Sequence, residues 1–139
     1  MIGLDTNSII YLLVTSQPEH LRAQKWFAEV SSPLCITSTN IAEALRLLTH
    51  PRVFPKPLSL TKAVTLLGSF LEQWNVHILE EDPSWWQQLP FLSKAHSGLK
   101  GNEVFDARIA LCLRYNGVKE LLTLDRNFEK YEFLKMVSF

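Results

Sequence analysis

Short apolar runs alternate with longer amphipathic stretches along the chain, and this alternation limits the folds that are possible. The runs predicted to form strands are MIGLD at 1–5, LCIT at 34–37, VHIL at 76–79, ELLTLD at 120–125 and KMVSF at 135–139. Strands that alternate with helices favour right-handed crossover connections and a sheet covered on both faces. The sequence therefore predicts an α/β fold, a three-layer α/β/α sandwich with a central, mainly parallel sheet of four to five strands.

Six segments between these runs have the apolar spacing of helices. They cover residues 6–13, 20–30, 40–48, 60–74, 84–95 and 103–115. Ser38 or Thr39 is expected to cap the third helix and Asn102 the sixth, whereas Pro90 is expected to interrupt or kink the fifth. Asn116 and Gly117 are predicted to end the sixth helix as a C-cap pair.

The chain has the size of one domain, and residues 1–139 are expected to form a single one. Hydrophobic residues make up 47% of it, and 14 basic residues balance 14 acidic ones. This balance argues against a disordered segment and against a broadly cationic nucleic-acid binder. A polyanion would therefore have to bind at a local cluster of basic residues.

Two further features concern the compartment. Cys35 and Cys112 lie in apolar runs without metal-ligand spacing, which predicts reduced thiols in the core. No stretch approaches the roughly twenty apolar residues that a membrane helix needs, and residues 1–7 lack the basic and apolar segments of a signal peptide. We expect a cytoplasmic protein with no membrane-spanning segment.

Four acidic residues occupy positions that an α/β fold brings together. Asp5 and Asp125 close two of the predicted strands, and in open parallel sheets ligands bind beyond the carboxyl ends of the strands. Glu43 and Asp106 lie early in helices, and helices that follow parallel strands begin at the same edge. Both interrupt unusually apolar helices, where charge burial is costly. The sequence predicts a cluster of four carboxylates.

A cluster of carboxylates needs a counter-charge. Mutual repulsion raises the pKa values of the acids and destabilises the fold unless protons or a hard cation neutralise them. Magnesium fits such a site, since it prefers oxygen ligands and usually binds a few carboxylates together with substrate phosphate. One or two ions could activate a water and stabilise the leaving oxygen of a phosphodiester. The predicted reaction class is metal-assisted hydrolysis.

Each acid taken alone also has a structural interpretation. Asp5 could cap the helix that follows it, and Asp125 could form a turn. The negative charge of Asp106 could interact favourably with the dipole at the start of its helix, and Glu43 could face solvent. Only the combination of the four positions favours a site.

The residues around these acids resemble the PIN-domain family, and within it the VapC toxins of bacterial and archaeal toxin–antitoxin pairs. LDTNSIIYLL is similar to the family's first motif, and TSTNIAEALRLLTHPRVFP to its second. NEVFDARIALCLRYNGVKELLTLDRNFEKY is similar to the third and fourth motifs. The resemblance covers nearly the whole chain, and the order and spacing of the motifs agree.

The resemblance implies a PIN-like fold and RNA cleavage that depends on Mg²⁺ or Mn²⁺, without a covalent enzyme intermediate. It makes four residues the catalytic and metal-binding acids: Asp5, Glu43, Asp106 and Asp125. Asn7 becomes a polar support, and so does Thr123, two residues before Asp125 on the same strand face. Either of these two could instead satisfy hydrogen bonds of a turn or strand end. The family also implies an RNA substrate, a cognate antitoxin that blocks the site and usually a homodimer.

Other polar and aromatic residues near the motifs are open to two interpretations. Glu103 could assist the metal site, although the favourable first turn of its helix is the preferred explanation. Five basic residues could hold RNA phosphates or form a solvated face, and Arg108 could equally pair with a carboxylate: Arg46, Arg52, Arg108, Arg126 and Lys130. The adjacent Trp85 and Trp86 cannot both face the core, so one is a candidate contact for a second subunit or an antitoxin, or a partly covered surface aromatic.

The sequence suggests two alternative functions. LDTNS lacks the second aspartate of the D-x-D pattern of haloacid-dehalogenase-like phosphatases, which argues against a phosphoaspartate enzyme. A non-catalytic PIN-like module that binds RNA or a protein is the remaining alternative. The four acids argue against it, because without a metal their repulsion would be uncompensated.

Overall fold

The computed structural model describes residues 1–139, and a five-stranded sheet lies at its centre. The strands are β1 Ile2–Leu4, β2 Leu34–Ile36, β3 His77–Ile78, β4 Glu120–Leu122 and β5 Lys135–Val137. Their order in the sheet is β3-β2-β1-β4-β5, and every neighbouring pair is parallel. The predicted α/β fold class with a mainly parallel sheet is confirmed.

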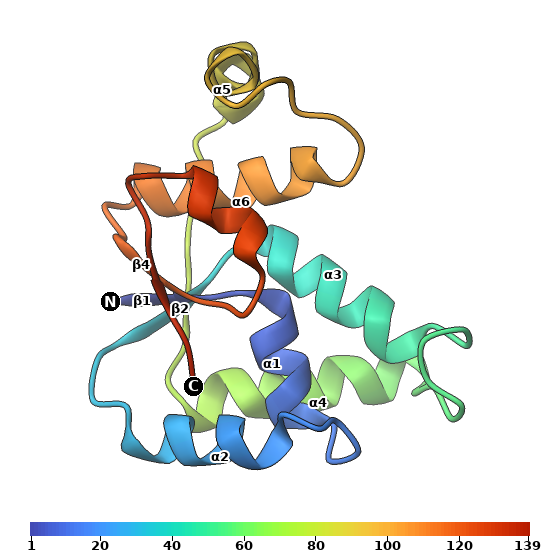
Figure 1. Cartoon of the computed structure of the whole chain (residues 1–139). Helices are drawn as coiled ribbons and strands as arrows, with labels where there is room; N and C mark the ends of the chain where they lie inside the picture. Colours follow the sequence, from blue (N-terminus) through green and yellow to red (C-terminus); the bar gives the residue numbers. More distant parts are fainter.

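Helices connect the strands and cover both faces of the sheet. They are α1 Thr6–Leu13, α2 His20–Glu29, α3 Ser38–Thr49, α4 Leu60–Gln73, α5 Leu89–Ala95 and α6 Glu103–Tyr115, with 3₁₀ helices η1 Trp85–Gln88 and η2 Arg126–Lys130. Figure 1 shows α2 and α4 on one side of the strands and α6 on the other, with α5 standing outside α6. No helix is both long and apolar enough to span a bilayer.

Alternating strand residues supply two separate cores. Ile2 and Leu4 of β1 join the core formed with α1 to α4, whereas Cys35 and Leu121 join the core formed with α6. This is the period of two expected of a strand buried on both faces. Gly3 faces α6 so closely that an added Cβ would lie 2.7 Å from Leu113 Cδ2. The two predicted core thiols, Cys35 and Cys112, are buried and unpaired.

Several helix ends differ from the sequence prediction. Thr37, rather than Ser38 or Thr39, caps α3, because a capping box with Asn40 satisfies the first free N–H groups. Asn102 occupies the N-cap position of α6 but makes no side-chain capping bond. Pro90 does not kink a helix: it lies in the first turn of α5, where its missing N–H costs nothing, and a 3₁₀ helix precedes it.

The end of α6 follows the prediction. Asn116 is the C-cap, and Gly117 has a φ of +69°, a left-handed conformation that glycine adopts without a steric penalty. The chain then returns directly into β4, which runs beside β1. The carboxyl ends of β1 and β4 are thereby placed next to each other.

Candidate active site

Asp5 lies where β1 ends and α1 begins, and both of its carboxylate oxygens accept hydrogen bonds. Oδ1 accepts from the backbone N–H of Thr6 and Oδ2 from the hydroxyl of Thr123, each over 2.8 Å. Asp5 therefore caps α1, and only 5% of its surface is exposed. Its pKa is raised from 3.8 to about 6, mainly by burial; the two hydrogen bonds oppose the rise, and the charges of Glu43 and Asp106 contribute to it.

Glu43 reaches the same region from α3, and a buried threonine orients it. The hydroxyl of Thr6 donates a 2.6 Å hydrogen bond to Glu43 Oε2 and accepts a 3.1 Å bond from the side-chain amide of Asn40. Thr37 holds Asn40 in turn, since its hydroxyl donates to Asn40 Oδ1 over 2.6 Å. This chain of hydrogen bonds ties the start of α1 to the first turns of α3.

Asp106 enters from the first turn of α6, which packs against α3. The side chain is partly buried. Its pKa is raised to about 6, mainly by burial and also by the negative charges of Asp125 and Glu43, whereas Lys130 opposes the rise. Asp106 is therefore close enough to Asp125 and Glu43 for their charges to interact.

Thr123 and Asp125 lie beyond β4, so the predicted strand over 120–125 is too long and their expected place on one strand face is wrong. The strand ends at Leu122. The hydroxyl of Thr123 accepts a 2.9 Å bond from the backbone N–H of Asp125, which turns the chain out of the sheet. Asp125 then caps η2, with Oδ1 accepting a 2.8 Å bond from the N–H of Asn127.

The four predicted acids thus start from separate elements and form one set of interacting charges. Glu43 and Asp106 raise the pKa of Asp5, while Asp125 and Glu43 raise the pKa of Asp106. The structural interpretation also holds for two of them, because Asp5 and Asp125 both cap helices. Capping and clustering are compatible, since a capping aspartate at the carboxyl end of a parallel strand points out of the same edge of the sheet.

The two predicted supports differ in their contacts. Thr123 bridges the carboxylate of Asp5 and the backbone of Asp125. Asn7 is exposed, and its side chain makes no hydrogen bond, because α1 turns the neighbouring Thr6 inward. Thr6 and Asn40 were not predicted. Their position in the sequence could have indicated them, since both are polar residues within the motifs of Asp5 and Glu43.

Nearby charged residues are mostly paired. Glu103, in the first turn of α6, accepts a 2.9 Å bond from Lys130 Nζ, and this pairing lowers its pKa. Arg108 binds Glu81 through two 2.7 Å hydrogen bonds, and its guanidinium lies 4.7 Å from the ring centre of Trp85. Glu103 thus lies in the first turn of its helix as preferred, and Arg108 pairs with a carboxylate, which was one of its two alternatives.

The donor chemistry of the acids fits a hard cation. All the groups are carboxylate oxygens, and two of them have pKa values near 6 because burial and neighbouring negative charge disfavour ionisation. No group of three or more His, Cys, Asp or Glu side chains is close enough to share an ion. Mg²⁺ commonly uses one or two carboxylates and keeps several waters, so a pair of these acids matches its needs.

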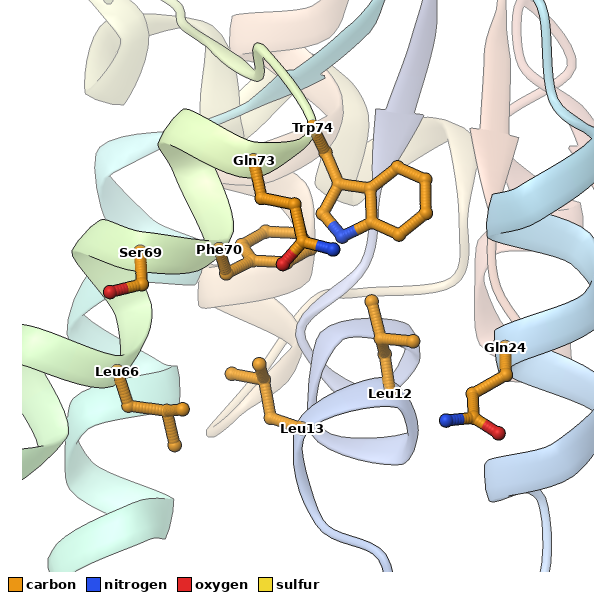
Figure 2. Close-up of a pocket in the computed structure, with 8 residues that line it drawn as sticks. All are labelled: Leu12, Leu13, Gln24, Leu66, Ser69, Phe70, Gln73 and Trp74. Carbon is orange, nitrogen blue, oxygen red and sulfur yellow. The ribbon is translucent and has the colours of Figure 1, made fainter.

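Two cavities have different linings. One of about 640 Å³ lies between α3 and α6, and Glu43 and Asp106 both line it. The other, of about 370 Å³, lies between α1, α2 and α4, and Figure 2 shows its largely apolar wall of Leu12, Leu13, Leu66, Phe70 and Trp74. Leu12 and Leu13 are at the opposite end of α1 from Asp5. Only the first cavity has the charged groups that hydrolysis needs.

A family comparison covers nearly the whole chain, including the four acids. The sequence model of the PIN domain matches residues 2–134. The chain belongs to the PIN-domain family. Its acids Asp5, Glu43, Asp106 and Asp125 all lie within the matched segment of this PIN domain.

Curated relatives of this PIN domain are named as ribonucleases. Ribonuclease VapC24 from Mycobacterium tuberculosis is 28% identical over 129 residues, which cover 91% of this chain and 88% of the relative. Ribonuclease VapC33 from the same organism is 30% identical over 86 residues, covering 60% of each chain.

Solved structures share the fold at lower sequence identity. Mycobacterium tuberculosis VapC20, described as a sarcin-ricin loop cleaving toxin, has a TM-score of 0.73 and 17% identity, covering 96% of this chain and 97% of that one. VapBC2 from Rickettsia felis, bound to a DNA fragment from its promoter, has a TM-score of 0.68 and 18% identity, covering 99% and 98%. These similarities support the PIN-like architecture.

Proposed function

We propose that this PIN domain is an endoribonuclease that depends on Mg²⁺ or Mn²⁺ and acts as the toxin of a toxin–antitoxin pair. The observation that carries the proposal is the placement of four acids from different elements at one edge of the sheet, where Asp5 and Asp106 both have raised pKa values and the charges of the other acids contribute to the rise. A fold under no functional demand would lower its free energy by dispersing such charges. The names of the curated relatives supply the substrate class.

In this proposal the acids divide between rigid and accessible positions. Asp5 is held by two hydrogen bonds and is buried, so it provides a fixed anchor for a cation. Glu43 is oriented by Thr6, and Asp106 faces the cavity through which RNA would approach. When bound, Mg²⁺ or Mn²⁺ would polarise a phosphoryl oxygen and lower the pKa of a water.

The non-catalytic module is less well supported. It would not require Asp5 and Glu43 to be oriented by buried hydrogen bonds, nor two partly or fully buried carboxylates with raised pKa values. Groups of this kind concentrate in functional sites, because their placement costs stability.

The partners follow from the same proposal. Structures of neighbouring fold include toxin–antitoxin complexes, and we extend that arrangement to a cognate antitoxin that covers the acids of this chain. We also keep the predicted homodimer and a cytoplasmic location, where RNA is available. Trp86 is 57% exposed whereas Trp85 is covered by Arg108, so Trp86 is the tryptophan open to a partner. Light scattering of the purified protein tests the dimer.

Cleavage of a mixed pool of structured RNA by purified protein tests the enzyme. Discrete cuts in Mg²⁺ or Mn²⁺ are expected, and both EDTA and the Asp106→Asn substitution should abolish them. The Glu132→Gln variant changes an exposed acid outside the cluster and is expected to cut like the wild type. A well-folded, antitoxin-free protein that cuts no RNA in the pool would count against the proposed activity.

The toxin role needs a separate test in cells. Expression of the wild-type chain is expected to arrest growth, and co-expression of the neighbouring gene is expected to relieve the arrest. The Asp106→Asn variant at equal abundance is the matched control. Normal growth at confirmed high expression of the wild type would contradict a toxin and would leave a role in RNA processing.

A further inference from the structure

The cavity between α3 and α6 extends beyond the acids and has a lining of mixed chemistry. Glu43 and Asp106 form one part of its wall. The rest includes Thr39 and Arg46 from α3 and Phe105 from α6. An aromatic ring, a cation and a hydroxyl group beside two acids are the groups that contact the base, phosphate and sugar of a nucleotide.

Phe105 is exposed in a way that packing does not explain. It precedes Asp106 on α6, has 48% of its surface exposed and belongs to neither hydrophobic core. An aromatic face beside carboxylates is a platform on which an unpaired base stacks, and such stacking contributes binding without demanding a sequence.

Arg46 is the unpaired cation of the cavity. Arg108 also lines it, but its charge is neutralised by the two hydrogen bonds to Glu81. Arg46 is exposed and makes no ion pair with any acid of the chain. A free guanidinium close to two carboxylates offers a phosphate its only favourable charge in this lining.

Thr39 carries a polar group that the protein leaves without a partner. The residue is only 5% exposed, and its Oγ1 is buried without a hydrogen bond. Such a hydroxyl loses its bonds to water on folding and regains a bond only when a ligand supplies one. Thr39 lines the cavity, so a rotation of its side chain would bring the buried hydroxyl to a ligand between α3 and α6.

We propose that Phe105, Arg46 and Thr39 form a nucleotide subsite adjoining the acids, where Phe105 stacks on an unpaired base of RNA. Arg46 binds a phosphate of the same strand, and the hydroxyl of Thr39 hydrogen-bonds to a sugar or phosphate oxygen. The inference rests on the proposed ribonuclease function for its substrate class. It adds that this surface accepts a base outside a duplex, because a paired base offers no free face to Phe105.

Binding measured in EDTA tests the subsite without cleavage. The probe is a short, fluorescein-labelled, single-stranded RNA of randomised sequence, with its duplex form as the comparison. Phe105→Ala and Phe105→Leu are each expected to weaken single-strand binding by about tenfold, whereas Phe105→Trp retains it, because stacking needs an aromatic face. Tyr115→Ala, which removes an exposed aromatic from the far end of α6, is the matched control and is expected to bind as the wild type does.

Arg46 and Thr39 are tested by the salt dependence of binding and by affinity together with melting temperature. Arg46→Gln is expected to reduce the slope of log affinity against log salt concentration by about 0.7, the value for one phosphate contact on a single strand. Lys25→Gln, an exposed cation on α2, should leave the slope unchanged. Thr39→Val should lower RNA affinity while leaving or raising the melting temperature, because it removes an unpaired buried hydroxyl.

The outcomes separate the subsite from the enzyme. RNA binding and cleavage that are equal in the wild type, Phe105→Ala and Arg46→Gln proteins would overturn the subsite and leave the ribonuclease standing. Binding that depends on Phe105 in a protein that cuts no RNA would support the subsite and overturn the ribonuclease. A wild type that neither binds nor cuts RNA would overturn both.

Discussion

The hydroxyl of Thr6 lies 2.6 Å from Glu43 Oε2, and this hydrogen bond joins two helices at residues 37 positions apart. Asn40 completes the arrangement by donating to the same hydroxyl. Thr6→Val removes the donor to Glu43 and leaves the Asn40 amide without its acceptor. We expect cleavage to fall about tenfold or more, since residues that orient metal-binding groups typically contribute 10- to 100-fold. Thr6→Ser keeps the hydroxyl and is expected to retain most activity; equal rates in both variants would show that Glu43 needs no orientation.

Thr123 controls the protonation of Asp5. Its hydroxyl donates to Asp5 Oδ2 over 2.8 Å, and this bond lowers the pKa of Asp5 against the effect of burial. Thr123→Val is expected to raise that pKa further, so the acidic limb of the pH–activity profile should move to higher pH. Thr123→Ser should leave the limb in place. A rate loss in Thr123→Val that is uniform across pH would point to misplacement of Asp5 rather than to its protonation.

Charge at Asp106 destabilises the fold at neutral pH. Its pKa of about 6 exceeds the ordinary 3.8, so the folded state binds a proton more tightly than the unfolded state. Stability from this group is therefore complete below about pH 4 and is lost as the pH rises through about 6. Asp106→Asn should be more stable than the wild type by about 1–2 kcal/mol at pH 8, allowing for solvent screening, and no more stable at pH 4. Urea unfolding at both pH values measures the difference, and Glu132→Gln is the control for an exposed acid.

Mn²⁺ should stabilise the wild-type fold because it neutralises the acids. A ligand present at about 100 times its dissociation constant adds about 2.7 kcal/mol, which raises the melting temperature by several degrees. The increase should vanish in Asp106→Asn and in EDTA, and persist in Glu132→Gln. An unchanged melting temperature of the wild type at millimolar Mn²⁺ would contradict a metal site and favour the non-catalytic module.

Gly3 lets α6 pack closely on β1. A Cβ at this position would lie 2.7 Å and 3.2 Å from the two terminal methyl groups of Leu113, which is itself buried. Gly3→Ala is expected to destabilise the protein by about 1–3 kcal/mol, the usual cost of overpacking. Gly68→Ala in α4, with no atom within 4 Å of the added Cβ, should instead stabilise it by about 0.5–1 kcal/mol. Thermal or urea unfolding of the pair compares the two sites.

Local pattern determined most of the fold. Residues 103–115 were predicted as a helix and form α6 with the same bounds, since apolar spacing and the Asn116–Gly117 end are encoded within one segment. The strand over 120–125 was predicted too long because the hydroxyl of Thr123 captures the N–H of Asp125 and ends the pairing. A turn of this kind competes with the strand through one side chain, which apolar patterning does not register.

That four acids follow strands or lie early in helices can be seen in the sequence alone, and parallel topology brings such positions to one edge. Which neighbouring side chains bind these acids depends on the packing of the folded chain. Thr6 faces inward and Asn7 outward, although both are polar and adjacent, because the rotation of α1 is set by its packing against α3. Arg108 binds Glu81, whereas Arg46 forms no ion pair. The orientation and pairing of these side chains depend on contacts between residues far apart in the chain. Helix propensity and apolar periodicity, in contrast, describe single elements.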